Sequence, residues 1–120
     1  MIPSQMLKGI IEGCILKVIS RRETYGYEIS EELKEYGFSG ISEGTIYPLL
    51  LRLEKNGLVL TEYKNSPVGP KRKYYTISPE GLEFIAQFCG NWKELSDAVN
   101  EVLKEGKEHG QENERAEQAE

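Results

Sequence analysis

Histidine and cysteine are scarce in this sequence of 120 residues, which contains one His and two Cys. His109 stands alone, and Cys14 and Cys89 are isolated rather than paired as Cys-x-x-Cys, so no metal-binding cluster is visible. The sequence also lacks a nucleophile–base pair and paired catalytic carboxylates. We therefore expect no catalytic residues, no metal and no cofactor. The two cysteines are expected to be reduced and buried as small hydrophobic residues.

Long apolar runs are also missing. No segment approaches the roughly 18 consecutive apolar residues of a membrane span, and the N-terminal residues lack the pattern of a secretory signal. A content of 38% hydrophobic and 29% charged residues is typical of a globular chain. These features predict a single cytoplasmic domain with no membrane partner.

Positive charge is in deficit overall, with a formal net charge of −5, but it is unevenly distributed. Residues 1–42 carry a net charge of −1, residues 43–75 carry +3, and residues 76–120 carry −7. Local charge decides where phosphate groups can bind, so the basic middle segment matters more than the total. That segment is the place to look for a nucleic-acid contact.

One amphipathic helix dominates the basic segment. Ser42 is a suitable N-cap, and Asn56-Gly57 is a typical helix stop. The expected buried stripe has helical spacing and consists of Ile46, Leu49, Leu50 and Leu53. The other face carries hydroxyl and basic groups of the kind that contact bases and phosphates: Thr45, Tyr47, Arg52 and Lys55. We expect this helix to enter a DNA major groove.

Two helices are predicted before it. Residues 5–20 have a wide apolar face and predict one mostly buried helix. Residues 24–36 predict a second helix whose outer face is strongly acidic. Residues 37–40 form a tight connection, and Ile41 is expected to join a small sheet. Two helices joined by a short Gly-containing turn are the signature of a helix-turn-helix.

A β-hairpin is predicted directly after the amphipathic helix. Residues 58–64 and 71–77 read as strands, and the six residues between them are rich in turn formers. The tip and return strand carry Lys64, Lys71, Arg72 and Lys73, which suit phosphates. Tyr74 and Tyr75 alternate, so one should face inward and the other outward. A hairpin in this position is the wing of a winged helix.

The last predicted helix begins at Ser78-Pro79-Glu80 and is about 25 residues long. Its apolar face is wide and includes Leu82, Ile85, Phe88, Cys89, Trp92, Leu95, Val99, Val102 and Leu103. A domain this small cannot cover such a face, so we expect it to pack against a second copy of the chain. The predicted fold is thus mostly α with a small β-hairpin. A winged helix-turn-helix spans 1–78, a dimerisation helix 79–104 and an acidic polar tail 105–120.

Three motifs in order resemble the PadR family of transcriptional regulators. They are Tyr-Gly-Tyr-Glu-Ile at 25–29, the segment 43–54, and Gly-Pro-Lys-Arg-Lys-Tyr-Tyr at 69–75. The resemblance covers roughly residues 5–104, and the single C-terminal helix is similar to that of the compact subfamily. It implies a winged-helix homodimer that represses transcription. In some compact members a pore at the dimer interface binds flat aromatic drugs against a pair of tryptophans, and Trp92 lies where that tryptophan is expected. The acidic tail has no counterpart in the family pattern.

Two sets of site residues follow. The expected DNA-binding set comprises Tyr25, Ser42, Gly44, Thr45, Tyr47, Arg52, Lys64, Lys71, Arg72 and Lys73. The expected dimer and effector seam comprises Phe88, Trp92 and Val99. Simpler readings stay open: Tyr47 as a prop for Pro48, the hairpin cations as solvated charges, and Trp92 as an ordinary packing residue. The predicted function is a homodimeric repressor of an inverted-repeat DNA operator, relieved by a planar aromatic effector. The alternative is a winged-helix protein-interaction module without DNA binding.

Overall fold

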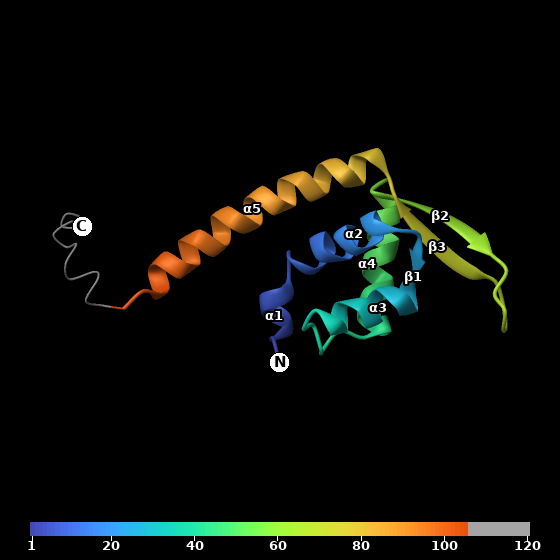
Figure 1. Ribbon diagram of the computed structural model, residues 1–120, viewed down its shortest axis with the longest axis horizontal. Coiled ribbons are helices and arrows are strands. Elements are labelled where there is room, and N and C mark those ends of the chain that lie inside the picture. The colour runs from blue at the N-terminus through green and yellow to red at the C-terminus, as the bar shows by residue number, and fades with distance from the viewer. Residues whose placement is uncertain (106–120) are drawn as a thin grey trace. The chain divides into compact units, whose positions relative to one another are not determined.

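The computed structural model describes residues 1–105, which fall into two compact units, Met1–Gln87 and Phe88–Glu120. The elements in chain order are α1 (Ser4–Leu7), α2 (Ile11–Arg21), β1 (Thr24–Tyr25), α3 (Gly26–Glu35), α4 (Glu43–Lys55), β2 (Val59–Lys64), β3 (Arg72–Ile77) and α5 (Pro79–Leu103) (Figure 1). Within the described residues, no helix is long and apolar enough to cross a membrane. The predicted acidic tail lies, apart from Glu105, outside the described residues.

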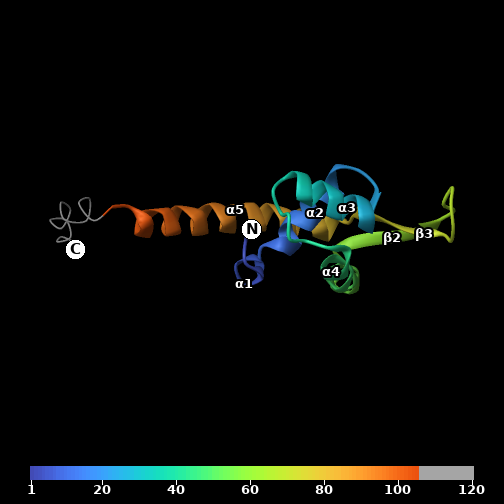
Figure 2. The ribbon, with the colours of Figure 1, turned by 90° about the horizontal axis from the view of Figure 1, so that it is seen from below.

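The core of the first unit lies where α2, α3 and α4 meet the sheet. Its fully buried apolar side chains are Ile15, Leu16, Ile19, Ile29, Leu33, Ile46, Leu50 and Leu53. Within each helix these residues recur at spacings of three or four, so a single apolar stripe per helix fills the centre. Seen from below, α3 and α4 lie on opposite sides of the hairpin (Figure 2). The β2–β3 hairpin extends beyond the three helices and leaves its end open to solvent (Figure 1).

The helix predicted over residues 5–20 is interrupted. The structure has the short α1 and a separate α2, and Gly9 between them has a φ of 83°. A left-handed residue cannot continue a right-handed helix, and glycine adopts that conformation at no steric cost. The apolar spacing continues across the break, so periodicity alone does not reveal it.

The sheet is larger than the predicted hairpin. Thr24 and Tyr25, which were predicted to open a helix, form β1 and pair antiparallel with Tyr75 and Tyr74 of β3. The strand order is therefore β1-β3-β2. Ile41 is not a member of the sheet: its amide donates to the carbonyl of Phe38, and its side chain packs in the core. Two extended residues are too few to give a strand period, so β1 could not be separated from the helix that follows.

The predicted caps of α4 are confirmed. The Ser42 hydroxyl accepts a hydrogen bond from the amide of Thr45 at 3.4 Å. At the other end Gly57 has a φ of 75°, and the amide of Leu58 reaches back to the carbonyl of Leu53 at 3.0 Å. This pattern is a Schellman motif, which satisfies the last carbonyls of the helix.

Ser78 joins β3 to α5. Its side chain is buried, and its hydroxyl donates to the carbonyl of Gly57 at 2.7 Å and accepts from the amide of Gly81 at 3.0 Å. The start of α5 is thereby fixed against the end of α4, as the predicted Ser-Pro-Glu start requires. α5 continues for 25 residues, the length expected from the sequence.

Candidate nucleic-acid interface

The outward face of α4 carries no acidic residue. Its exposed positions are Gly44, Thr45, Tyr47, Pro48, Leu51, Arg52 and Lys55. Glu43 and Glu54, the two acids of the helix, are only half-exposed at its margins. Leu51 is 60% exposed and was missed by the sequence analysis. It lies four residues after Tyr47 and four before Lys55, a spacing that could have placed it on this face.

Tyr47 is positioned by Gly26. The tyrosine is 46% exposed, yet its ring lies so close to the start of α3 that a Cβ at position 26 would come within 2.6 Å of its Cε1 atom. Burial, with a smaller contribution from Glu43, raises the pKa of the phenol. Tyr47 therefore offers a protonated hydroxyl at the junction of α3 and α4.

Arg52 lies on the exposed side of α4 but is not an isolated cation. Its Nε atom donates to Glu12 of α2 at 2.7 Å. The two residues are 40 positions apart, so this ion pair could not be seen in the sequence. Arg52 links α4 to α2, and among the exposed residues of α4 this leaves Lys55 as the cation without a described partner.

The hairpin cations also have intramolecular partners. Lys64 Nζ lies 2.8 Å from Glu23, which raises the pKa of the lysine, and Lys73 Nζ lies 2.7 Å from Glu54 of α4. Lys71 is exposed and, among residues 1–105, forms no ion pair. The acidic partners hold two of the four predicted cations against the sheet.

Two of the hairpin cations pack against aromatic rings. The Arg72 guanidinium lies 4.1 Å from the ring centroid of Tyr25, and Lys64 lies 5.4 Å from that of Tyr74. The two tyrosine rings meet edge to face at 5.4 Å. Tyr75, the next residue of β3, is only 3% exposed, so the predicted alternation of the two tyrosines is confirmed. The structure thus brings Tyr25, Arg72 and Lys64 together on one face of the three-stranded sheet.

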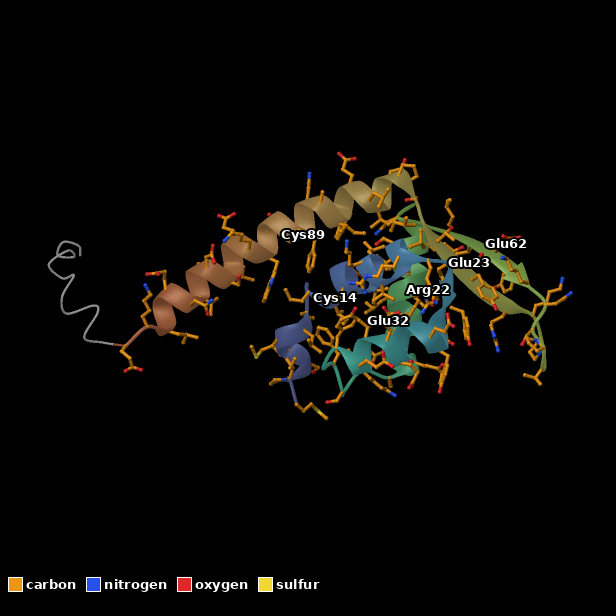
Figure 3. The ribbon with its side chains drawn as sticks, in the orientation of Figure 1. Cys14, Arg22, Glu23, Glu32, Glu62 and Cys89 are labelled. Carbon is orange, nitrogen blue, oxygen red and sulfur yellow. The ribbon has the colours of Figure 1, made fainter. Side chains whose placement is uncertain are left out.

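The outer face of α3 has the opposite charge. A hollow of about 550 Å³ is lined there by Arg22, Tyr27, Glu28, Glu31, Glu32, Glu35 and Tyr36. Arg22 neutralises part of this surface through Glu28 at 3.3 Å and Glu32 at 3.7 Å, and Figure 3 shows Arg22 and Glu32 on neighbouring elements. Phosphates would be repelled by α3 and attracted toward α4 and the hairpin.

The second unit presents an apolar row on α5. Trp92, Leu95 and Val99 are 49%, 49% and 45% exposed, and Phe88 is half-buried. Cys89, which Figure 3 labels on α5, is exposed as well, so the prediction that both cysteines are buried is wrong for this one, because it belongs to a largely exposed turn of that helix. Cys14 is half-buried, and burial raises the pKa of its thiol.

A helix-turn-helix followed at once by a β-hairpin defines a winged helix-turn-helix protein. The family model for the transcriptional regulator PadR-like family matches residues 15–87. The chain belongs to the PadR-like family of transcriptional regulators, as its motifs predicted.

Individual relatives agree with this family assignment. A PadR-like transcriptional regulator from Bacillus cereus is 51% identical, with 84% of this chain and 98% of that chain covered and a TM-score of 0.75. A transcriptional regulator from Clostridium thermocellum is 33% identical, with coverage of 87% and 100% and a TM-score of 0.76. A transcriptional regulator of Mycobacterium tuberculosis is 32% identical over 89 residues, which are 74% of this chain and 78% of that protein. These relatives are described as regulators rather than as enzymes.

Proposed function

We propose that this regulator binds double-stranded DNA with the outward face of α4 and the β2–β3 hairpin, and that it represses transcription as a homodimer. The observation that carries the proposal is the exposed surface of α4, which is free of acidic residues and shares a hollow with the hairpin cations Arg72 and Lys73. Such a surface can enter a major groove without repelling the phosphates on either side. A regulator of this kind acts on DNA in the cytoplasm.

The DNA contacts divide by chemistry. Gly44, Thr45, Tyr47 and Leu51 offer small, hydroxyl and apolar groups to base edges, where a leucine methyl can contact the methyl of thymine. Ser42 uses its hydroxyl as the cap of α4 and orients the first turn. The hairpin cations contact the DNA phosphates, and Tyr25 holds one of them, Arg72, in place. These cations are Lys64, Lys71, Arg72 and Lys73. Arg52 contributes by fixing α4 to α2.

The apolar row of α5 supports the homodimer. Phe88, Trp92, Leu95, Val99 and Val102 repeat at alternating spacings of four and three, which is the heptad pattern of a helix-helix seam. A two-fold dimer would place its two α4 helices on an inverted repeat, with half-sites one helical turn (~10 bp) or a multiple apart. Leu95→Glu should yield a monomer by light scattering, and Asn100→Glu, on another face, should leave the dimer intact.

Trp92 supports a small-molecule effector at the same seam. A half-exposed tryptophan between apolar neighbours can stack against a planar aromatic cation. Because Trp92 is the single tryptophan, its fluorescence reports on this position alone. Saturable quenching that also releases bound DNA would support relief of repression by an effector. Quenching without any effect on DNA binding would contradict it.

The decisive experiment measures fluorescence anisotropy with DNA from upstream of the protein's own gene at two salt concentrations. The wild type is compared with a triple variant in which Lys64, Arg72 and Lys73 are changed to Glu. A control triple variant changes Lys8, Lys17 and Lys34 to Glu, which gives the same net charge away from α4 and the hairpin. We expect tight, salt-sensitive binding that the hairpin variant loses and the control largely keeps. Equal losses in the two variants would count against the assigned surface.

The acidic hollow on α3 favours one other function, a module that binds a basic protein partner without DNA. Its four glutamates are concentrated on one face, which is suited to a basic peptide. The hairpin variant separates the two functions, because it should abolish binding to DNA and leave binding to such a partner unchanged. Failure of the wild type to bind DNA, together with partner binding that the hairpin variant keeps, would favour this second function.

A further inference from the structure

A small hollow lies between α4 and the sheet, on the side that the Proposed function assigns to DNA. Its volume is about 220 Å³, and it is lined by Tyr25, Gly26, Tyr47, Leu51, Arg72, Lys73 and Tyr75. The lining includes two cations, three phenols and no carboxylate. It is smaller than the ~300 Å³ at which pockets for drug-sized molecules begin, and its polar groups suit one compact anion.

Tyr75 has a hydroxyl without a partner. The residue is 3% exposed, and within residues 1–105 its phenol forms no hydrogen bond. A buried polar group that is left unpaired destabilises the fold, so such a group calls for a reason. The other buried polar side chains of the core are not in this position: Ser78 bonds to Gly57, and Ser30 bonds to Tyr27.

The surroundings of Tyr75 favour a negatively charged acceptor. Burial raises the pKa of the phenol, Lys73 lowers it and Glu54 raises it further, so the hydroxyl stays protonated and can donate. Lys73 Nζ lies 5.7 Å from the centroid of the Tyr75 ring and 2.7 Å from Glu54. The Glu54 carboxylate does not line the hollow. The Lys73 ammonium can therefore also attract an anion that lies in the hollow, on the side away from Glu54.

We propose that this hollow receives one phosphate of the DNA backbone when α4 is in the groove. The Tyr75 hydroxyl donates to a phosphate oxygen, and Arg72 and Lys73 supply the charge. This inference rests on the proposed function. It assigns a DNA contact to Tyr75, whereas the sequence predicted only that one of Tyr74 and Tyr75 faces inward and the other outward. A phosphate held between α4 and β3 would set the depth and register of α4 on the duplex.

Tyr75→Phe tests the proposal because it removes only the hydroxyl. Since that hydroxyl bonds to no protein atom among residues 1–105, the variant should be as stable as the wild type or more so. Its binding to operator DNA should weaken by roughly tenfold, because a hydrogen bond to a charged group is lost. The salt dependence should not change, because no charge is lost. Tyr63→Phe is the matched control: Tyr63 is 63% exposed on β2 and lies outside the hollow.

Replacement of single DNA phosphates by neutral methylphosphonate identifies the contact itself. We expect one position in each half-site where the replacement weakens the wild type more than it weakens Tyr75→Phe, because the variant keeps only the charge of Arg72 and Lys73 at that phosphate. Equal binding by Tyr75→Phe and wild type, or the absence of any such position, overturns the proposal while the Proposed function stands. Failure of the wild type to bind DNA overturns both. Binding of inorganic phosphate that depends on Tyr75, with DNA binding unaffected, would assign the hollow to a free anion and overturn the DNA contact.

Discussion

The ring of Tyr47 packs directly against Gly26: a Cβ at position 26 would lie 2.6 Å from Cε1 and 2.9 Å from the hydroxyl oxygen of Tyr47. Tyr47, which follows 21 positions later in the sequence, can therefore keep this place only while residue 26 is glycine. The contact fixes the direction in which Tyr47 leaves the outward face of α4.

Gly26→Ala should displace Tyr47 rather than unfold the protein. The tyrosine is 46% exposed, so its ring can swing into solvent, and we expect a stability loss below the ~1–3 kcal/mol typical of overpacking. DNA affinity should fall because the hydroxyl moves. The double variant Gly26→Ala/Tyr47→Ala should bind no more weakly than Tyr47→Ala alone, measured by anisotropy. Additive losses would show that Gly26 acts through some other contact.

Gly81 and Gly90 should respond in opposite ways to alanine. A Cβ on Gly81 would overlap the backbone carbonyl of Leu58 and come within 2.6 Å of Cδ1 of Ile77, and backbone cannot move aside cheaply. Gly90, on the same helix, has nothing within 4 Å of a Cβ. Urea unfolding should show Gly81→Ala destabilised by about 1–3 kcal/mol. Gly90→Ala should be neutral or stabilised by up to about 1 kcal/mol. Similar midpoints for the two variants would contradict the packing described at Leu58.

Removal of the Ser78 hydroxyl should weaken the junction of β3 and α5. Ser78→Ala loses the cap of α5 and leaves the Gly57 carbonyl without its donor, which together should cost about 1–3 kcal/mol. Ser96→Ala is the control, because Ser96 only bonds back to Lys93 within the same helix. Thermal unfolding that affects both variants equally would argue against a special role for Ser78.

Acid should abolish the contribution of the Glu54–Lys73 pair. The hydrogen bond from Lys73 lowers the pKa of the Glu54 carboxyl below its ordinary value of 4.5. The associated stability is therefore complete above pH 4.5 and is lost as the pH falls through the folded pKa. The difference in unfolding free energy between wild type and Glu54→Gln should be constant from about pH 6 to 8 and shrink in acid. A difference that stays constant down to acid pH would contradict this role of the Glu54–Lys73 pair.

The local features of α4 were predictable because they depend on residues close in the sequence. Ser42 and Gly57 terminate α4 through bonds within five residues, and its buried stripe follows directly from the helical repeat. The features that were missed involve distant partners. β1 exists because β3 pairs with it, Arg52 meets Glu12, and Tyr75 shares a hollow with Tyr47 of α4. None of these relationships leaves a periodic signal in one segment.

The connection between β3 and α5 consists of Ser78 alone, and hydrogen bonds make it rigid. A hinge needs residues that can change their backbone angles freely, yet the Ser78 amide, the Ser78 hydroxyl and the Gly81 amide are all engaged, the first two with the segment that ends α4. The first turn of α5 therefore cannot rotate without disturbing Gly57 and Leu58. A rotation of this first turn would be transmitted directly to the C-terminal end of α4, because no flexible loop separates the two.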